Sequence, residues 1–454
     1  MSAFFKLSPA WRYTILGIAA VAVVLLLGFA WIVLGPGPTD FARGSRIALA
    51  DYHGADPTGV PPELHSASLV ARGEYLAQAA DCTSCHTAKG GVPFAGGLPI
   101  VLPFGTIYTP NITPDKETGI GGWSDAAFLG AIHKGIDDEG QHLYPAMPYV
   151  SYTGMTDADA LAIKAYLFSL KPVHADVPGN TFVFPFNQRW LMGVWSFLFN
   201  PDKRFAPDPA QSPQWNRGAY IAENLEHCGE CHTPRTLFQS LDNRRKFAGA
   251  LQAGWRAYNI SSDADSGVGA WSDAALADYL SSGHAEGHGT AGGPMAEAVD
   301  NSLSHLSPGD IAAIVAYLRS VPPIASSDLP APKTSPAPVS HKQGLVADYD
   351  PRGKQIFEGA CASCHDWTGV SPVVAAATLT GARAVNDRTA INVAQVVLNG
   401  EARQTPHGQV FMPAFGSAYT NQEIAAVANY VTARFGAQPS SITARDIAKL
   451  RQEN

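Results

Sequence analysis

The longest apolar segment lies near the N-terminus, where residues 14–34 form an uncharged run of 21 residues. As a helix this run would be about 31 Å long, enough to cross the hydrocarbon layer of a bilayer. A buried core helix would show a polar face, which this run lacks. The competing interpretation is a cleaved signal peptide, whose apolar core is usually about 7–15 residues and is followed by small residues. Residues 31–34 are bulky. We therefore expect a retained anchor over residues 1–45, with its helix at about 14–34.

Three later segments repeat apolar residues at helical spacing, and each follows a hydroxyl residue that can cap a helix. These segments begin at Thr156, Ser307 and Thr420. Each carries an aromatic residue at the same position, namely Tyr166, Tyr317 and Tyr430. We expect these three segments to be amphipathic helices whose tyrosines pack one helix on another.

All six cysteines lie in three copies of the pattern Cys-x-x-Cys-His. The copies are Cys82/Cys85/His86, Cys228/Cys231/His232 and Cys361/Cys364/His365. This pattern is typical of c-type haem attachment, in which both thiols bond to the haem and the histidine binds its iron. A thioredoxin-like site needs no adjacent histidine, and zinc ribbons place their two cysteine pairs only about 15–20 residues apart. The sequence therefore predicts three covalently bound haem c groups.

The sequence around the motifs is repeated, which indicates tandem units. An Arg-Gly pair precedes each motif, beginning at Arg72, Arg217 and Arg352. After the first two motifs, Asn111-Ile112 recurs as Asn259-Ile260. A short helix before the motif and an amphipathic helix after it form the layout of a small cytochrome c domain. We expect an all-α fold with an N-terminal transmembrane helix and three tandem cytochrome c domains, at 67–180, 205–325 and 345–440.

A methionine is the expected second axial ligand of each haem iron. The candidates are Met147, Met295 and Met412, each beside a proline in a loop before the last helix of a unit. Proline stiffens the backbone and lowers the cost of presenting the thioether, and Met/His ligation raises the haem potential. Met155 and Met192 are expected to be packing residues. Four other histidines are expected to be ordinary residues that do not bind iron: His142, His227, His284 and His288. Of these, His284 and His288 are alternative candidate ligands to Met295.

Composition narrows the class of protein further. Charged residues make up 15% of the 454 residues, against roughly 25% in an average protein, and 46% are hydrophobic. This balance excludes a disordered, highly charged chain. The 43 glycines and 34 prolines predict many loops. A formal net charge of −8 gives no support for nucleic-acid binding, which favours a basic patch.

Two connecting stretches differ sharply in composition. Residues 324–343 are rich in proline, serine and alanine and indicate a linker between the second and third units. Residues 181–202 contain five phenylalanines and two tryptophans, but Arg189 and the prolines argue against a membrane span. Three interpretations of this apolar stretch stay open: packing between domains, an interface with a partner, or contact with the membrane interface.

The motif sequences resemble a known family. RGEYLAQAADCTSCHTA, GTIYTPNITPD, YPAMPY and HCGECHTPR are similar to the membrane-bound triheme cytochrome c subunit of bacterial quinone-reducing dehydrogenases, which act on alcohols, gluconate or aldehydes. The resemblance covers residues 67–450. It implies that the chain accepts electrons from a separate catalytic dehydrogenase subunit (a quinoprotein, flavoprotein or molybdoprotein) and passes them through three haems to ubiquinone. It also implies the cysteine, histidine and methionine roles given above.

The expected role is thus that of a non-catalytic electron-transfer subunit, because no dinucleotide fingerprint or nucleophile motif is present. Two alternatives are a multihaem peroxidase-like enzyme and a cytochrome subunit that feeds a terminal oxidase. Lys6 and Arg12 before the apolar run favour a cytoplasmic N-terminus. We therefore expect a single-pass protein of the cytoplasmic (inner) membrane with its haem domains facing the periplasm.

Overall fold

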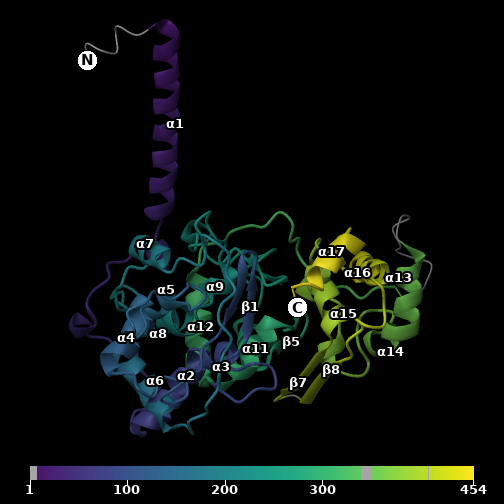
Figure 1. The fold of residues 1–454 in the computed structure, drawn as a ribbon. Coiled ribbons are helices and arrows are strands. Elements are labelled where there is room, and N and C mark those ends of the chain that lie inside the picture. The colour runs from purple at the N-terminus through teal and green to yellow at the C-terminus, as the bar shows by residue number, and fades with distance from the viewer. Residues whose placement is uncertain (1–7, 339–349, 407, 454) are drawn as a thin grey trace.

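The computed structural model describes residues 8–338, 350–406 and 408–453. One long helix, α1 (Pro9–Val33), stands away from a body of shorter helices and hairpins (Figure 1). The first, second and third units are the segments around the three Cys-x-x-Cys-His motifs. The third unit lies to one side of the first two in Figure 1. Lys6 and the expected start of the third domain near 345 fall outside the described residues.

Helix α1 begins at Pro9, five residues before the expected start at 14, and ends at Val33, one residue before the expected end. The Ser8 hydroxyl accepts a hydrogen bond from the Trp11 backbone N–H, and Pro9 occupies the first turn, where its missing N–H costs nothing. The helix stops just before Gly35-Pro36, because proline cannot continue it. None of the residues Tyr13–Val33 is buried inside the protein. By length and composition the helix fits a membrane span, a description that a signal sequence also meets.

The first unit combines short helices with one hairpin. Its helices are α2 (Leu69–Ala79), α3 (Cys82–His86), α4 (Asp125–Lys134), α5 (Tyr149–Tyr152) and α6 (Asp157–Ser169). Its strands are β1 (Pro99–Leu102) and β2 (Gly105–Tyr108). Helix α7 (Trp190–Phe199) follows and occupies part of the apolar stretch.

The second unit repeats this order with additions. Its helices are α8 (Pro213–Tyr220), the π-helical turn η5 (Ile221–Leu225), α9 (Gly229–His232), α10 (Asp273–Ser282), α11 (Pro294–Asn301) and α12 (Pro308–Ser320). Its strands are β3 (Ala250–Gln252), β4 (Trp255–Ala257), β5 (His284–Ala285) and β6 (Gly289–Thr290).

The third unit is built on the same plan. Its helices are α13 (Pro351–Ile356), the π-helical turn η8 (Phe357–Cys361), α14 (Ala362–His365), the 3₁₀ turn η9 (Ala375–Ala377), α15 (Ile391–Asn399), α16 (Asn421–Phe435) and α17 (Ala444–Leu450). Its strands are β7 (Glu401–Thr405) and β8 (Gly408–Met412).

The fold is helix-rich but contains short strands, which differs from the all-α expectation. In the described residues the strands pair as antiparallel hairpins: β1–β2, β3–β4, β5–β6 and β7–β8. Each strand is only two to five residues long. Gly254 lies in the β3–β4 turn, and Gly105 and Gly289 begin β2 and β6; all three have positive φ angles that favour glycine. The expectation of a helix-rich fold is therefore confirmed, but the short hairpins depart from an all-α fold.

The three capped amphipathic helices are confirmed. The side chains of Thr156, Ser307 and Thr420 accept hydrogen bonds from the first turns of α6, α12 and α16. Thr420 also forms a capping box with Glu423. Each cap satisfies a backbone N–H that would otherwise lack a partner at the helix start.

In each unit the helix before the motif crosses the capped helix at very short range. The crossing glycines are Gly73, Gly218 and Gly353, which follow the three repeated arginines. A Cβ on any of them would overlap a backbone carbonyl oxygen, that of Ala162, Ala313 or Ala426 respectively. The repeated tyrosine of the capped helix lies beside the same glycine. The Arg-Gly repeat therefore marks a helix crossing, and the tyrosines pack one helix on another, as expected.

The first two units exchange equivalent hydrogen bonds. The Tyr75 hydroxyl on α2 donates to Asp310 on α12 at 2.6 Å, and the Tyr220 hydroxyl on α8 donates to Asp159 on α6. Each tyrosine oxygen also accepts from the backbone N–H of the partner unit's capping residue, Ser307 or Thr156. The two units are thus joined as a two-fold-related pair within one chain, an arrangement otherwise typical of symmetric dimers.

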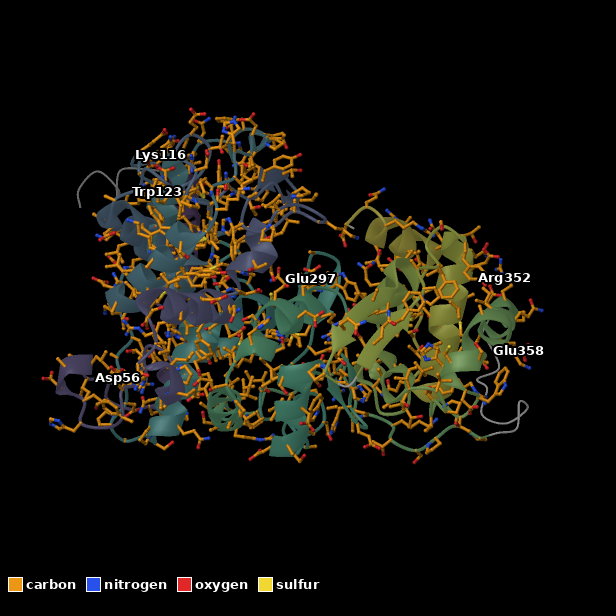
Figure 2. All side chains as sticks on the ribbon, turned by 90° about the horizontal axis from the view of Figure 1, so that it is seen from below. Asp56, Lys116, Trp123, Glu297, Arg352 and Glu358 are labelled. Carbon is orange, nitrogen blue, oxygen red and sulfur yellow. The ribbon has the colours of Figure 1, made fainter. Side chains whose placement is uncertain are left out.

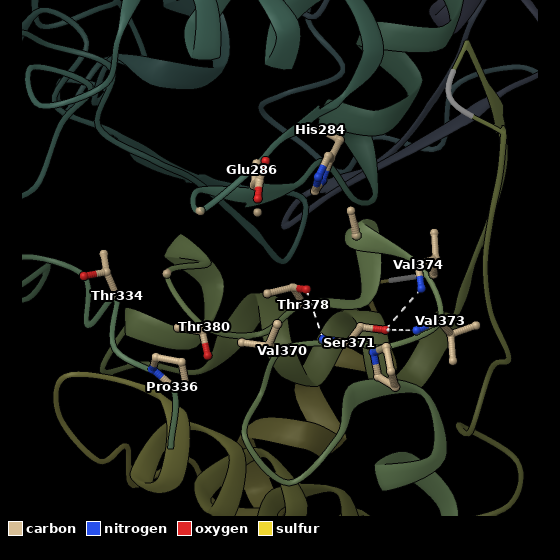
Figure 3. Close-up of a pocket in the computed structure, with 15 residues that line it drawn as sticks. His284, Glu286, Thr334, Pro336, Val370, Ser371, Val373, Val374, Thr378 and Thr380 are labelled. Carbon is tan, nitrogen blue, oxygen red and sulfur yellow. Dashed lines mark hydrogen bonds between the residues drawn. The ribbon is translucent and has the colours of Figure 1, made fainter. Parts of the chain in front are cut away.

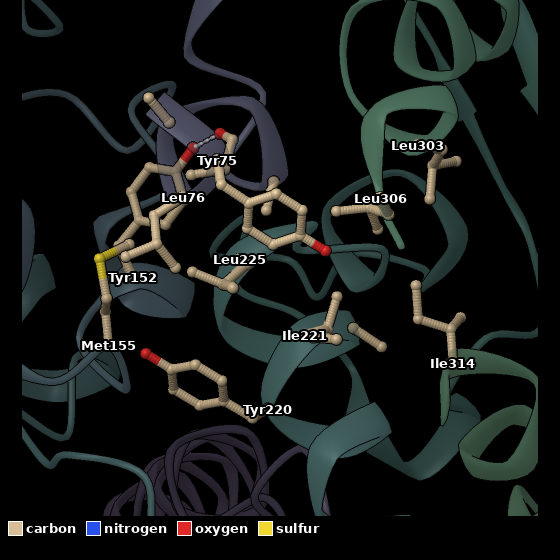
Figure 4. Packing of buried hydrophobic residues seen from close by; sticks show 14 of the residues in the cluster. Tyr75, Leu76, Tyr152, Met155, Tyr220, Ile221, Leu225, Leu303, Leu306 and Ile314 are labelled. Carbon is tan, nitrogen blue, oxygen red and sulfur yellow. Dashed lines mark hydrogen bonds between the residues drawn. The ribbon is translucent and has the colours of Figure 1, made fainter. Parts of the chain in front are cut away.

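This pairing merges the interiors of the first two units. One cluster of buried apolar side chains runs from Val60 to Val321, and Figure 4 shows side chains of both units within it. A second cluster, from Ala337 to Leu450, belongs to the third unit. Residues 324–338 are not a free linker, because Leu329 and Ala337 are buried and the backbone bonds to the third unit. The remaining linker residues, 339–343, lie outside the described residues.

Candidate haem centres

Each Cys-x-x-Cys-His motif forms a single helical turn. The turns are α3, α9 and α14, and on such a turn residues i and i+3 lie on the same face. The chain bends sharply just before the first cysteine of the first two motifs, where Asp81 and His227 have φ angles of 48° and 38°. In the first motif the Ser84 hydroxyl donates to Asp81 at 2.6 Å and fixes this bend. Both thiols of a motif are therefore presented side by side.

The three motif histidines share one hydrogen-bonding arrangement. Nδ1 of His86, His232 and His365 lies 2.8, 2.6 and 2.6 Å from the carbonyl oxygens of Pro110, Tyr258 and Ala377. A carbonyl can only accept, so Nδ1 carries the proton and Nε2 keeps its lone pair. Burial also lowers the pKa of each ring, which favours the neutral form that binds a metal. This is the arrangement expected of iron-ligating histidines.

Two buried asparagines hold the first two of these carbonyls. Asn111 and Asn259, which directly follow Pro110 and Tyr258, are each 2% exposed. The Asn111 amide donates to the Val173 carbonyl at 2.7 Å, and the Asn259 amide donates to the Ile324 carbonyl at 2.6 Å. Both asparagines belong to the sequence repeat, which by itself indicates no role for them. Their buried position gives them one, namely to fix the loop that orients the histidine.

The cysteines border the cores without being fully enclosed. The first thiol of each motif, that of Cys82, Cys228 or Cys361, packs against a core cluster but remains half-buried. Burial raises the pKa of Cys82 to about 12 and that of Cys361 to about 11, so these thiols are neutral near pH 7. A thioether is also neutral. Two neighbouring thiols and a histidine with an available Nε2, at the edge of an apolar core, fit the donor set of haem c.

The candidate methionines occupy different kinds of position. Met147 lies in the turn before α5, as expected, whereas Met295 is the second residue of α11 and Met412 is the last residue of β8. The loop expectation was thus wrong for the latter two, because Pro294 starts a helix and β8 extends to Met412. All three side chains are half-buried against a core cluster. Met155 is instead 1% exposed inside the core, beside Tyr152 in Figure 4, as expected for a packing residue.

The attachment motifs of the first two units lie close together. Burial, followed by the neighbouring Asp81 and Cys231, raises the pKa of Cys85 to about 12. The Asn301 amide at the end of α11 donates to Ser84 in the first motif at 2.9 Å. Glu297, also on α11, lies near the centre of the molecule in Figure 2. Helix α11 of the second unit therefore packs directly on the first Cys-x-x-Cys-His motif.

Buried carboxyl groups lie in this interface. The Ser302 hydroxyl is 2.5 Å from the Gln78 carbonyl oxygen and 2.7 Å from a Glu226 oxygen. The Ser302 hydroxyl is the donor to both oxygens, so its single proton is shared between them. Burial raises the pKa of Glu226 well above its usual value, and it raises that of Asp81 to about 7.

The second and third units meet through their methionine-bearing segments. The Arg403 guanidinium forms two hydrogen bonds with Asp300, of 2.9 and 2.7 Å. Glu401, which pairs with Met412 in the β7–β8 hairpin, accepts a hydrogen bond of 3.3 Å from the Gly293 backbone N–H, two residues before Met295. Arg352 and Glu358, on the first turns of the third unit, lie at its outer edge in Figure 2.

The other histidines have identifiable surroundings. His284 Nδ1 lies 2.9 Å from the Thr290 hydroxyl, and His288 stacks on Trp271 with 4.0 Å between ring centroids. His227 packs edge-on against Tyr152, and His142 lies against Gly193 of α7.

A cavity of 440 Å³ lies between the second and third units. Figure 3 shows His284 and Glu286 on one side of it and Ser371, Val373 and Thr378 on the other. These residues of the third unit belong to the loop that carries the Ala377 carbonyl. The cavity therefore adjoins the loop that orients His365.

Comparison with known proteins agrees with this reading of the motifs. The family model for cytochrome c matches residues 70–171 and 351–434. The fructose dehydrogenase cytochrome subunit of Gluconobacter japonicus is 38% identical over 87% of this chain and 85% of its own length. The gluconate 2-dehydrogenase cytochrome c subunit of Pantoea cypripedii is 37% identical over 85% of this chain and 90% of its own. The cytochrome c subunit of the quinone alcohol dehydrogenase of Gluconobacter oxydans is 34% identical over 85% and 82%. The chain therefore belongs to the family of cytochrome c subunits of dehydrogenases.

Proposed function

We propose that the chain is the electron-transfer subunit of a dehydrogenase complex, with three tandem cytochrome c domains near 67–180, 205–325 and 345–440. Each domain would bind one haem c covalently. The observation that carries this proposal is the threefold repetition of one histidine arrangement, with Nδ1 on a backbone carbonyl and Nε2 available for iron. The chain would have no substrate chemistry of its own.

The residue roles follow from the motifs. The cysteine pairs would form the thioether bonds, the motif histidines would be one set of axial ligands, and Met147, Met295 and Met412 would be the other. When bound, haem c supplies a one-electron iron couple. The protein fixes the ring of each histidine through its carbonyl and keeps an apolar core against each attachment site.

The contacts between units support a linear path with the second unit in the middle. Its helix α11 lies against the first attachment motif. Its Met295 segment lies against the hairpin that ends in Met412. Electrons moving between the first and third haems would therefore pass through the second.

The partners proposed are a catalytic dehydrogenase subunit as electron donor and ubiquinone as acceptor. Support for the donor comes from the relatives, which are named as subunits of fructose, gluconate 2- and alcohol dehydrogenases. Support for the acceptor comes from the alcohol dehydrogenase relative, whose name specifies a quinone. A quinoprotein, a flavoprotein or a molybdoprotein could fill the donor role.

Purification of the full chain in mild detergent tests this function. We expect a catalytic dehydrogenase to co-purify and its substrate to reduce all three haems, which a ubiquinone analogue then reoxidises. Rapid binding of carbon monoxide to the reduced, unmodified protein would instead indicate an open iron site and a peroxidase-like enzyme. Reoxidation only by a copper–haem oxidase, with none by the quinone analogue, would support the terminal-oxidase alternative.

Haem content provides a separate prediction. We expect three haems per mature chain in a pyridine haemochrome assay, since three complete attachment motifs are present. The double variant Cys361→Ala/Cys364→Ala should contain two covalent haems, because the other motifs lie in a separate core cluster. Two or fewer haems in the fully matured unmodified chain would contradict the prediction.

The N-terminus provides a further prediction. We propose that α1 is retained as a single membrane anchor in the cytoplasmic membrane and that the haem domains face the periplasm, where c-type haem is attached. N-terminal sequencing of the mature protein should then give Met1 or Ser2 as the first residue. A start near Thr39 would show that the segment is a cleaved signal sequence.

A further inference from the structure

The apolar stretch is divided by the structure into an inner and an outer face. On α7, Trp195 packs against Tyr149 and Phe199, with ring centroids 6.2 and 5.3 Å apart. Trp190, Val194 and Phe197 point the other way and are 65%, 52% and 85% exposed. Their spacing of four and three residues places them on one face of the helix. The ten residues of α7 carry no charge.

A turn of the second unit extends the exposed face. The Trp195 indole N–H donates to the Phe238 carbonyl at 2.8 Å, and Phe199 packs on the Phe238 ring at 6.1 Å. The neighbouring Leu237 is 83% exposed. We define the α7 patch as Trp190, Val194, Phe197 and Leu237.

This patch is fixed beside the end of α1. The Phe238 ring meets the Phe29 ring edge-on at 5.8 Å between centroids. The Arg244 guanidinium stacks on Trp31 at 3.9 Å and donates to the Trp31 carbonyl at 2.5 Å. Figure 1 shows α7 at the foot of α1, on the face of the body from which α1 rises.

The depth of the patch follows from helix geometry. Phe29 lies four residues before Val33, the end of the apolar span, which corresponds to about 6 Å along the helix axis. Helices that lie in a membrane interface bury their apolar face by about 5–10 Å. Tryptophan is also enriched at this depth, because its ring is amphipathic. If α1 crosses the bilayer, the ring of Phe238 is therefore level with the lipid interface.

We propose that the α7 patch is inserted in the lipid interface and forms a second membrane contact beside α1. This inference rests on the proposed retention of α1 as an anchor. Leu237 and Phe238 follow His232 by five and six residues. The second haem motif is thus directly connected to the lipid-facing turn, which places it next to a membrane-soluble electron acceptor.

Photolabelling of the full haem-loaded chain in phosphatidylcholine vesicles tests the proposal. The probe is a phospholipid with a photoreactive group on the first carbons of its acyl chain, and adducts are mapped by mass spectrometry. We expect adducts in residues 13–33, 190–199 and 236–239. Peptides with Val373, which is 68% exposed but lines the cavity between the second and third units, should remain unlabelled.

A variant separates lipid contact from general reactivity. The double change Trp190→Ser/Phe197→Ser should reduce adducts within 190–199 by about tenfold or more, because lipid burial of a large apolar side chain favours insertion by at least that factor. Labelling of 13–33 should be unchanged. The matched control Val373→Ser should alter neither region.

The outcomes distinguish this inference from the anchor on which it rests. Adducts in 13–33 with none in 190–199 or 236–239 would overturn the inference and leave the anchor intact. Absence of adducts in 13–33 would overturn the proposed anchor itself. Protection of the patch by a co-purified dehydrogenase subunit, with no lipid adducts there, would show a protein interface and would also overturn the inference.

Discussion

Replacing Met412 by alanine is expected to lower the midpoint potential of one haem by on the order of 0.1–0.2 V, within the ~0.8 V range that axial ligands span. The neutral thioether favours ferrous iron, so its loss favours the ferric form. The vacant position should also bind carbon monoxide in the reduced protein. Haem content should remain three, because Cys361 and Cys364 still provide covalent attachment. A spectroscopic redox titration of the full chain measures the potential.

Met155→Ala is the matched control. Met155 is 1% exposed in the core, so its truncation should cost about 2–5 kcal/mol of stability and leave all three potentials unchanged. Met147→Ala and Met295→Ala should each behave like Met412→Ala, on a different haem. A fall in potential with Met155→Ala and none with Met412→Ala would show that the ligand assignment is wrong.

Local signals explain why much of the site could be predicted from sequence. The Cys-x-x-Cys-His motif is contiguous, and so is the hydroxyl that starts each amphipathic helix. The structure places Thr156, Ser307 and Thr420 at helix starts with their side chains bonded to the first turn. Such caps depend on neighbours within a few residues, which is why a single sequence reveals them.

The joining of the first two units depends on residues far apart in the chain. Tyr75 follows the first Arg-Gly pair by two residues, and Tyr220 follows the second in the same way. Each hydroxyl bonds to the other unit rather than to its own. The repeat shows that the two positions are equivalent, but it does not show that they are exchanged. That information resides in the tertiary arrangement alone.

The placement of Met295 and Met412 shows a similar limit. A proline beside a methionine signals a stiff backbone, yet it fits a loop, a first helical turn or a strand end equally well. Pro294 starts α11, as proline often does at a first helical position. Met412 ends β8, and that hairpin forms against the second unit through Glu401 and Arg403. At Met412 the local structure therefore involves contacts between units, which the sequence does not show.

Gly218→Ala is expected to destabilise the paired first and second units by about 3 kcal/mol, at the upper end of the usual cost of overpacking. The added Cβ would overlap the Ala313 carbonyl oxygen and press on Tyr317, and a backbone carbonyl cannot move without shifting helix α12. For a cooperative unit of this size, such a loss lowers the Tm by roughly 6–12 °C. Thermal unfolding of the haem-loaded chain, followed by circular dichroism, measures the shift.

Gly309→Ala on α12, the helix against which Gly218 of α8 packs, is the control, because its Cβ would meet only the Ser307 hydroxyl oxygen, at 3.7 Å. Alanine is a better helix former than glycine, so this change should add up to about 1 kcal/mol to the free energy of unfolding. The Tm should therefore stay unchanged or rise. Gly353→Ala should reproduce the loss in the third unit, since its Cβ would overlap the Ala426 carbonyl oxygen. Because the third unit has its own core cluster, that loss should appear as an earlier, separate transition. An unchanged Tm in both Gly218→Ala and Gly353→Ala would show that the Arg-Gly repeat does not mark a close helix crossing.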